Sequence, residues 1–118
     1  MKVENPAAQV KESKIVKEGW LEKRGEHIKT WRRRYFVLRE DGSLLGFKER
    51  PEPERRALPC NTLSVKGHCQ VRCLERPKQF SFIVTGFRRQ QKVQRMFSVR
   101  SNRARAAWVS FEFGFKRF

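Results

Sequence analysis

The sequence has no long hydrophobic run and little acidic charge. No apolar stretch approaches the roughly 20 residues that cross a bilayer. The polar N-terminus, MKVENPAAQVKESK, also lacks the hydrophobic segment of a secretory signal peptide. We therefore expect a cytoplasmic chain in which residues 1–14 form a flexible leader and residues 15–118 form one domain.

Cysteine and histidine are scarce. The chain has three cysteines and two histidines, and an odd number of thiols without a secretory signal is typical of reduced cysteines. His68, Cys69 and Cys73 are close enough in sequence to suggest zinc. A closed zinc site needs four ligands, however, and the remaining candidates, Cys60 and His27, are isolated. We expect three free thiols, no metal and no cofactor.

Catalytic motifs are missing as well. There is no glycine-rich phosphate loop, no kinase catalytic loop with its metal-binding aspartate, and no serine, histidine and aspartate set. The sequence therefore predicts a binding module and excludes an enzyme of these classes.

Basic and aromatic residues are abundant instead. The formal net charge is +16, from 28 Lys and Arg against 12 Asp and Glu, and so large an excess indicates an anionic partner such as nucleic acid or an acidic membrane. Ten Phe, three Trp and one Tyr supply the core of a single domain in 118 residues.

Short alternating runs separated by turn residues predict a mainly β fold, a small sandwich or barrel. A proline-rich loop, ERPEPERRALP, interrupts the runs. Ser101 or Asn102 can cap a final helix over about residues 102–113, with Trp108 as its core anchor. The expected strands are Lys17 to Arg24, Trp31 to Arg39, Leu44 to Lys48, Thr62 to Val65, Gln70 to Leu74, Phe80 to Gly86 and Gln94 to Val99.

Side chains alternate faces along a strand, so core residues and cations share a face in three strands. In the first strand Lys23 shares a face with Leu21. In the second, Arg32 and Arg34 share a face with Phe36 and Leu38, and in the last strand Arg95 shares a face with Phe97 and Val99. An unpaired buried charge costs several kcal/mol, so these cations must meet where the barrel opens to water. Such a mouth would bind a polyphosphorylated ligand. The alternative is a solvated basic face that shares this parity by chance.

The segment VKEGWLEKRGEHIKTWRRRYFVL resembles the start of the pleckstrin-homology (PH) domain of RAC/Akt serine/threonine kinases. GSLLGFKERPE, NTLSVKGHCQV, ERPKQFSFIV and VQRMFSV continue the similarity in order. The resemblance covers roughly Ile15 to Trp108.

This resemblance implies a seven-stranded, bent antiparallel PH-type barrel capped by one C-terminal α-helix. It implies a monomer that binds phosphatidylinositol 3,4,5-trisphosphate or 3,4-bisphosphate in the inner leaflet and so recruits its parent to the plasma membrane. A kinase domain would follow in cis. The family's phosphate contacts fall on Lys23, Arg32, Arg34 and Arg95, with Glu26 and Asn61 at the edge of the pocket.

The chain departs from the family pattern in three places. FRRQQK, from Phe87 to Lys92, replaces an apolar segment that contains tryptophan. Gly86 stands where the family has a cysteine, which leaves Cys69 without the family's disulfide partner. The last helix has arginines in place of an acidic first turn, which predicts a weak helix, and the ending FEFGFKRF favours a divergent or truncated copy.

Two classes of function remain open from the sequence. The first is the phosphoinositide-binding module. The second is a basic nucleic-acid-binding domain, favoured by arginine-rich patches with nearby aromatic residues. Glu26, the acidic residue in the basic turn, either softens repulsion among the cations or excludes headgroups that engage too few of them.

Overall fold

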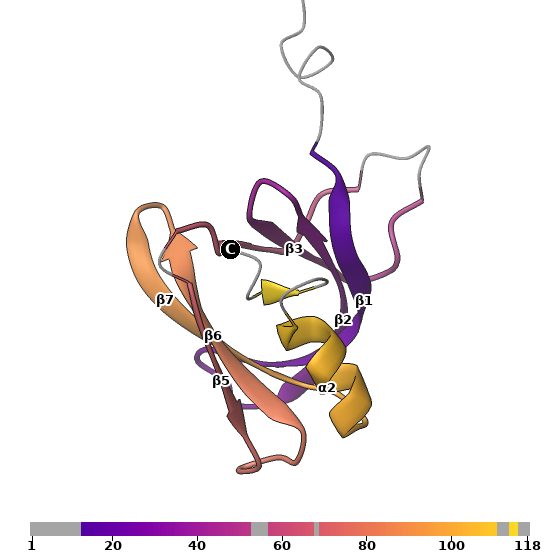
Figure 1. Cartoon of the computed structure of the whole chain (residues 1–118), viewed down its shortest axis with the longest axis vertical. Helices are drawn as coiled ribbons and strands as arrows, with labels where there is room; N and C mark the ends of the chain where they lie inside the picture. The colour runs from indigo at the N-terminus through magenta and orange to yellow at the C-terminus, as the bar shows by residue number, and fades with distance from the viewer. Residues whose placement is uncertain (1–12, 53–56, 68, 111–113, 116–118) are drawn as a thin grey trace, which may run out of the picture.

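The computed structural model describes residues 13–52, 57–67, 69–110 and 114–115. The first 12 residues of the expected leader lie outside the described residues. Seven strands and a C-terminal helix, α2 (Asn102–Val109), lie in the described part (Figure 1), which confirms the predicted mainly β fold. The strands are β1 (Ile15–Arg24), β2 (Trp31–Arg39), β3 (Ser43–Phe47), β4 (Asn61–Ser64), β5 (Gln70–Leu74), β6 (Ser81–Arg88) and β7 (Gln91–Ser98).

The strands form one antiparallel sheet in the order β4, β3, β2, β1, β7, β6, β5. A pairing of Ser64 in β4 with Phe87 in β6 closes the sheet into a barrel. Gly86 makes this closure possible, because a Cβ atom there would lie 2.4 Å from the carbonyl oxygen of Ser64. A side chain at residue 86 would therefore have to displace the β4 backbone from its present position in this barrel.

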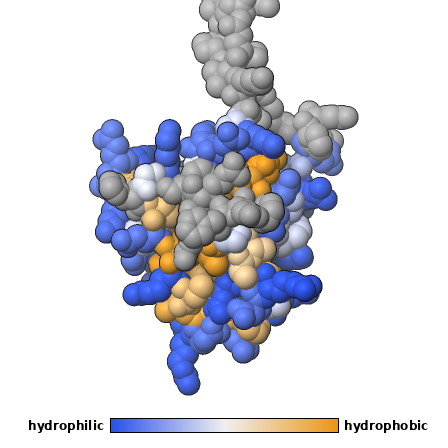
Figure 2. Space-filling model, in the orientation of Figure 1, coloured by the Kyte–Doolittle hydropathy of each residue, from blue (hydrophilic) through white to orange (hydrophobic). Residues whose placement is uncertain are grey.

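The core is built from the inward faces of the strands, as their alternation predicts. Phe36, Phe82 and Phe97 are all at most 2% exposed. The Phe36 ring meets the Phe97 ring edge to face, with centroids 5.0 Å apart. Hydrophilic residues cover most of the face shown in Figure 2, and hydrophobic ones appear near its centre.

Helix α2 begins at a serine cap and covers one end of the barrel (Figure 1). The Ala104 backbone N–H donates to the Ser101 hydroxyl, at 3.0 Å. Trp108 is 3% exposed and stacks on Phe115 at 5.7 Å, which confirms it as a core anchor. The helix ends at Val109, earlier than the expected residue 113, and Ser110 is extended. Phe115 is 1% exposed. Residues 111–113 lie outside the described residues.

Arg105, which we expected to weaken the first turn of the helix, ties α2 to the sheet. Its guanidinium donates to the carbonyl oxygens of Leu74 (3.0 Å) and Ser81 (3.1 Å). It also forms a 2.7 Å ion pair with Glu75, and this contact lowers the pKa of that carboxyl group. The side chain thus satisfies strand-end carbonyls and fixes the helix on the barrel.

The FRRQQK segment forms a tight hairpin. Strands β6 and β7 continue to the Arg88 and Gln91 pair, and only Arg89 and Gln90 lie between them. Their φ angles are 51° and 67°, the left-handed conformation that a two-residue type I′ turn requires at both central positions. The FRRQQK segment therefore joins β6 and β7 directly, and the strand pairing continues up to the turn.

A second apolar cluster lies on the outer face of β2 and β3. Tyr35, Val37 and Phe47 are buried there. The Tyr35 hydroxyl donates to Glu18 Oε1 at 2.7 Å, and burial together with this bond raises the pKa of Tyr35 to about 12. The sequence pattern did not predict this cluster.

Candidate functional site

Strand register brings basic residues together at the open end of the barrel. In the β1 and β2 pairing, Lys23 lies opposite Arg32, and Leu21 lies opposite Arg34. The β7 residue Phe97 pairs with Lys23 on the other side of β1. Arg95, which shares the face of Phe97, therefore approaches the same place from β7.

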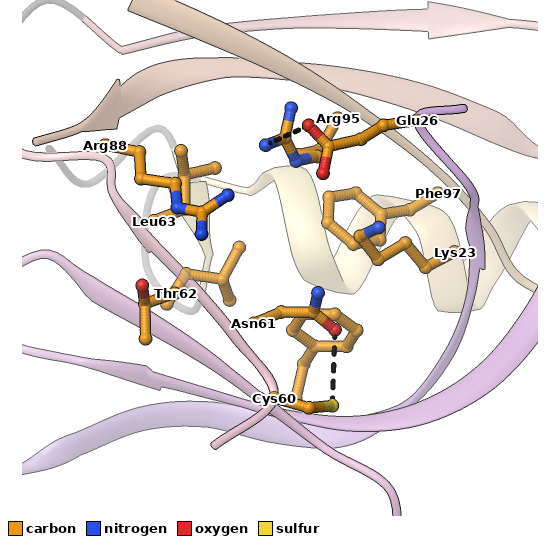
Figure 3. A pocket seen from close by; sticks show the side chains of 11 residues that line it. Lys23, Glu26, Cys60, Asn61, Thr62, Leu63, Arg88, Arg95 and Phe97 are labelled. Atoms are coloured by element: carbon orange, nitrogen blue, oxygen red, sulfur yellow. Dashed lines mark hydrogen bonds and ion pairs between the residues drawn. The ribbon is translucent and has the colours of Figure 1, made fainter. Parts of the chain in front are cut away.

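Lys23 is the most enclosed of these cations. The residue is 9% exposed although it carries an ammonium group. Burial and the charge of Arg95 lower its pKa, and Glu26 offsets part of this effect. No hydrogen bond or ion pair links the ammonium to another of the described residues. Lys23 therefore points a poorly solvated charge into the mouth of the barrel (Figure 3).

Two adjoining cavities occupy this mouth. The larger is about 360 Å³, and the smaller, about 30 Å³, reaches the core residues Phe36 and Phe97. Lys23, Glu26, Cys60 and Asn61 line both cavities. Arg32 and Arg34 line the larger cavity, and Arg95 lines the smaller. All six sequence-predicted residues are thus brought to one continuous site.

Glu26 and Arg95 are paired across the top of the site (Figure 3). Arg95 Nη2 lies 2.7 Å from Glu26 Oε1, and Arg95 Nη1 donates to the carbonyl oxygen of Gln94 at 2.8 Å. The Arg95 side chain is 11% exposed, whereas that of Glu26 is 41% exposed. The carboxylate therefore occupies the position beside Arg95 that a ligand anion would take.

Asn61 enters the site as the first residue of β4. It pairs with Gly46 of β3, where a Cβ atom would lie 2.6 Å from the Phe36 ring and 3.1 Å from the Asn61 Cβ. A side chain at residue 46 would therefore push both Phe36 and Asn61. The thiol of Cys60 donates to the Asn61 amide oxygen at 3.5 Å.

Sequence reasoning missed several residues of the site, among them Arg88, Lys48 and Cys60. Arg88 and Cys60 line the smaller cavity, and Lys48 lines the larger. Strand parity could have found two of them, because Arg88 follows inward-facing Gly86 by two positions and Lys48 follows Gly46 in the same way. Cys60 precedes its strand, so no alternation marks it.

The described residues hold no group of three or more His, Cys, Asp and Glu side chains suited to a metal ion. His68, which lies near Cys69 and Cys73 in the sequence and was considered with them as a zinc ligand, is outside the described residues. All three cysteines, which are described, are free thiols. No helix in the described ranges is long and apolar enough to cross a membrane.

Comparison with known sequences identifies relatives for most of the chain. The RAC serine/threonine-protein kinase of Drosophila melanogaster is 43% identical over 106 residues, which cover 86% of this chain and 17% of the kinase. The RAC-beta serine/threonine-protein kinase of Homo sapiens is 46% identical over 99 residues, which cover 83% of this chain and 20% of the kinase. The chain spans about a fifth of the length of these curated relatives.

Solved structures with this fold include the C-terminal PH domain of pleckstrin in complex with D-myo-Ins(1,2,3,4,5)P5. It is 25% identical, with 80% of this chain and 90% of that chain covered and a TM-score of 0.62. The pleckstrin homology domain of human KIAA0053 protein is 25% identical, with 92% of both chains covered and a TM-score of 0.66. The PH domain family model matches residues 15–111. This chain therefore belongs to the PH domain family.

Proposed function

We propose that this chain is a phosphoinositide-binding module that recruits its parent protein to the plasma membrane from the cytoplasm. Its ligands are the 3-phosphorylated headgroups of phosphatidylinositol 3,4,5-trisphosphate and 3,4-bisphosphate. The observation that carries the proposal is the convergence of Lys23, Arg32, Arg34 and Arg95 on two adjoining cavities at the barrel mouth.

The side chains suit a ligand with several phosphates. Arg32 and Arg34 present planar forks that match phosphate oxygens, and each charge-assisted bond contributes roughly 1.5 to 3 kcal/mol. A phosphate beside Lys23 would relieve the repulsion between that ammonium and Arg95. Asn61 supplies an amide at the edge, where it can bond a hydroxyl or a phosphate oxygen.

The relatives support the same class of ligand. The pleckstrin PH domain was solved with an inositol pentakisphosphate, and the closely similar sequences are RAC kinases. We propose that a serine/threonine kinase domain accompanies this domain in cis, because the matched region is about a fifth of those kinases. The module itself would act as a monomer and bind without catalysis.

Vesicle flotation across a panel of phosphoinositides, with duplex DNA as a competitor, tests the proposal. We expect retention on vesicles with 3-phosphorylated lipids to exceed retention on vesicles of equal charge made with phosphatidylserine, and to survive the competitor. A nucleic-acid-binding domain would instead follow total charge and lose affinity steeply with salt. Equal retention on all anionic vesicles, abolished by DNA, would overturn the proposal.

A further inference from the structure

The mouth of the barrel contains a reactive group that phosphate binding does not require. Cys60 is exposed and lies just before β4, where its backbone N–H donates to the Gly46 carbonyl oxygen at 2.8 Å. Its thiol donates to the Asn61 amide oxygen at 3.5 Å. Cys60 lines both cavities, and Figure 3 shows its side chain among the residues that line the smaller one.

The surroundings of this thiol attract anions. Lys23, nine-tenths buried and with no partner for its ammonium among the described residues, points into the cavities that Cys60 lines. Three more cations, Arg32, Arg34 and Lys48, line the larger cavity, and Glu26 is the one acidic residue among the described residues of its lining. A cleft lined by one sign of charge raises the local concentration of the opposite sign. Anionic reagents should therefore accumulate beside Cys60.

We infer that Cys60 is a modification site for anionic low-molecular-weight disulfides, and that the mixed disulfide closes the phosphate site. The modification stands on the geometry of Cys60 and Lys23 alone. The loss of headgroup binding that follows from it rests on the proposed function.

The reaction needs no oxidant beyond the small disulfide. The Cys60 thiol loses its proton, and the thiolate attacks one sulfur of the reagent. A new sulfur–sulfur bond forms as the reagent's own bond breaks, and the departing half leaves as a thiolate that takes up a proton. Cys60 is oxidised while the released half is reduced to a thiol. The attached half carries its carboxylates into the cavity beside Lys23, where they compete with phosphate.

The other two cysteines are internal controls. Cys73 is an exposed thiol on β5 and lines neither cavity. Cys69 is partly buried, and burial raises the pKa of its thiol to about 11. If exposure alone decided reactivity, Cys60 and Cys73 would react alike with every reagent.

The first test compares reagent charge on the unmodified sequence. The reduced domain is treated with glutathione disulfide, which is anionic, or with cystamine, which is cationic, and adducts at each cysteine are counted over time by peptide mass spectrometry. We expect the ratio of the Cys60 rate to the Cys73 rate to be at least about fivefold higher with glutathione disulfide. Inositol hexakisphosphate should slow the reaction of Cys60 and leave that of Cys73 unchanged. An equal ratio for the two reagents would overturn the inference.

Variants test separately whether Cys60 is modified and whether its modification blocks headgroup binding. Lys23→Gln should slow Cys60 modification by glutathione disulfide and should not slow modification by cystamine, which the Lys23 charge repels. On vesicles, treatment should release the Cys73→Ser protein but not the Cys60→Ser protein, each compared with its own untreated sample. Adducts without vesicle binding before treatment would contradict the proposed function and leave the modification site standing. Vesicle binding that glutathione disulfide does not disturb, despite full modification of Cys60, would contradict the blocking role.

Discussion

At the scale of single residues, Glu26 occupies the ion-pairing position beside Arg95. Because Arg95 and Glu26 form a 2.7 Å ion pair, a headgroup phosphate must displace the Glu26 carboxylate to bind this arginine. A ligand that engages several basic residues can compensate for the lost pair, whereas a ligand with fewer contacts cannot. Under the proposed function, we therefore expect Glu26 to act on selectivity as well as on affinity.

We predict that Glu26→Lys raises binding to phosphatidylinositol 4,5-bisphosphate by a larger factor than binding to the 3,4,5-trisphosphate. The change removes a competing carboxylate and adds a cation well inside the Debye length of about 8 Å, so screening is weak. Matched vesicle titrations of both proteins on both lipids measure the two ratios. An equal gain on the two lipids would show that Glu26 is only a background charge.

If Lys23 contacts the ligand, the affinity for the ligand depends on pH. Burial and Arg95 lower the pKa of the ammonium in the free domain, and bound phosphates would raise it. Under the proposed function, we therefore expect affinity to be full below the lowered pKa and to fall as pH rises through it, because binding must then take up a proton.

We expect calorimetry with inositol tetrakisphosphate to show affinity declining as the pH rises towards the ordinary lysine pKa of 10.5, in a range where phosphate monoesters are already fully ionised. Lys23→Arg should flatten this decline, since a guanidinium keeps its charge over the range. Identical pH profiles for the two proteins would show that Lys23 does not contact the ligand.

At the scale of elements, α2 depends on its cap. The first turn of the helix has no acidic residue, so the Ser101 hydroxyl, bonded to the Ala104 N–H at 3.0 Å, is its main local stabilisation. Ser101→Ala should lower the free energy of unfolding by about 1 kcal/mol. Ser101→Asp should retain it, because the carboxylate caps the helix and complements the helix dipole. Urea titration of both variants checks this. An unchanged free energy of unfolding in Ser101→Ala would mean that the cap contributes nothing.

The β6 and β7 hairpin carries local strain. Arg89 and Gln90 both adopt positive φ, which costs roughly 1 to 2 kcal/mol for a residue with a side chain. The double substitution Arg89→Asn with Gln90→Gly introduces the pair of residues that type I′ turns prefer, and it should raise the free energy of unfolding by about 1 kcal/mol in a urea titration. Arg89→Gln, which removes the charge and keeps the strain, is the matched control. A stabilisation as large in the control would assign the gain to charge.

Alternation along strands made much of this structure predictable. It placed Lys23, Arg32 and Arg34 on the core side, because residues two positions apart in a strand point to the same face and each of these cations is an even number of positions from a core residue. The tight turn was not predictable, since arginine and glutamine have no preference for positive φ and only the pairing of β6 with β7 imposes it. The outer cluster around Tyr35 was missed for a related reason. Parity shows that a residue points outward but not that other segments cover it.

At the scale of the whole molecule, a net charge of +16 attracts any polyanion. Binding to an anionic surface therefore does not by itself show that the pocket is used. A test must change the pocket while the total charge stays equal. Strand β2 offers such a pair, because Arg34 lines the larger cavity whereas the neighbouring Arg33 faces outward over the Trp20 ring, 4.1 Å away.

The most direct measurement is calorimetry of inositol tetrakisphosphate with Arg34→Ala and Arg33→Ala, each first checked by thermal unfolding. Both variants lose one positive charge. Arg34→Ala should lower affinity at least about tenfold, because it removes charge-assisted bonds of roughly 1.5 to 3 kcal/mol each. Arg33→Ala should lower it less than about twofold. Equal losses in the two folded variants, or a loss below about fivefold for Arg34→Ala, would show that overall charge binds the ligand and that the pocket does not.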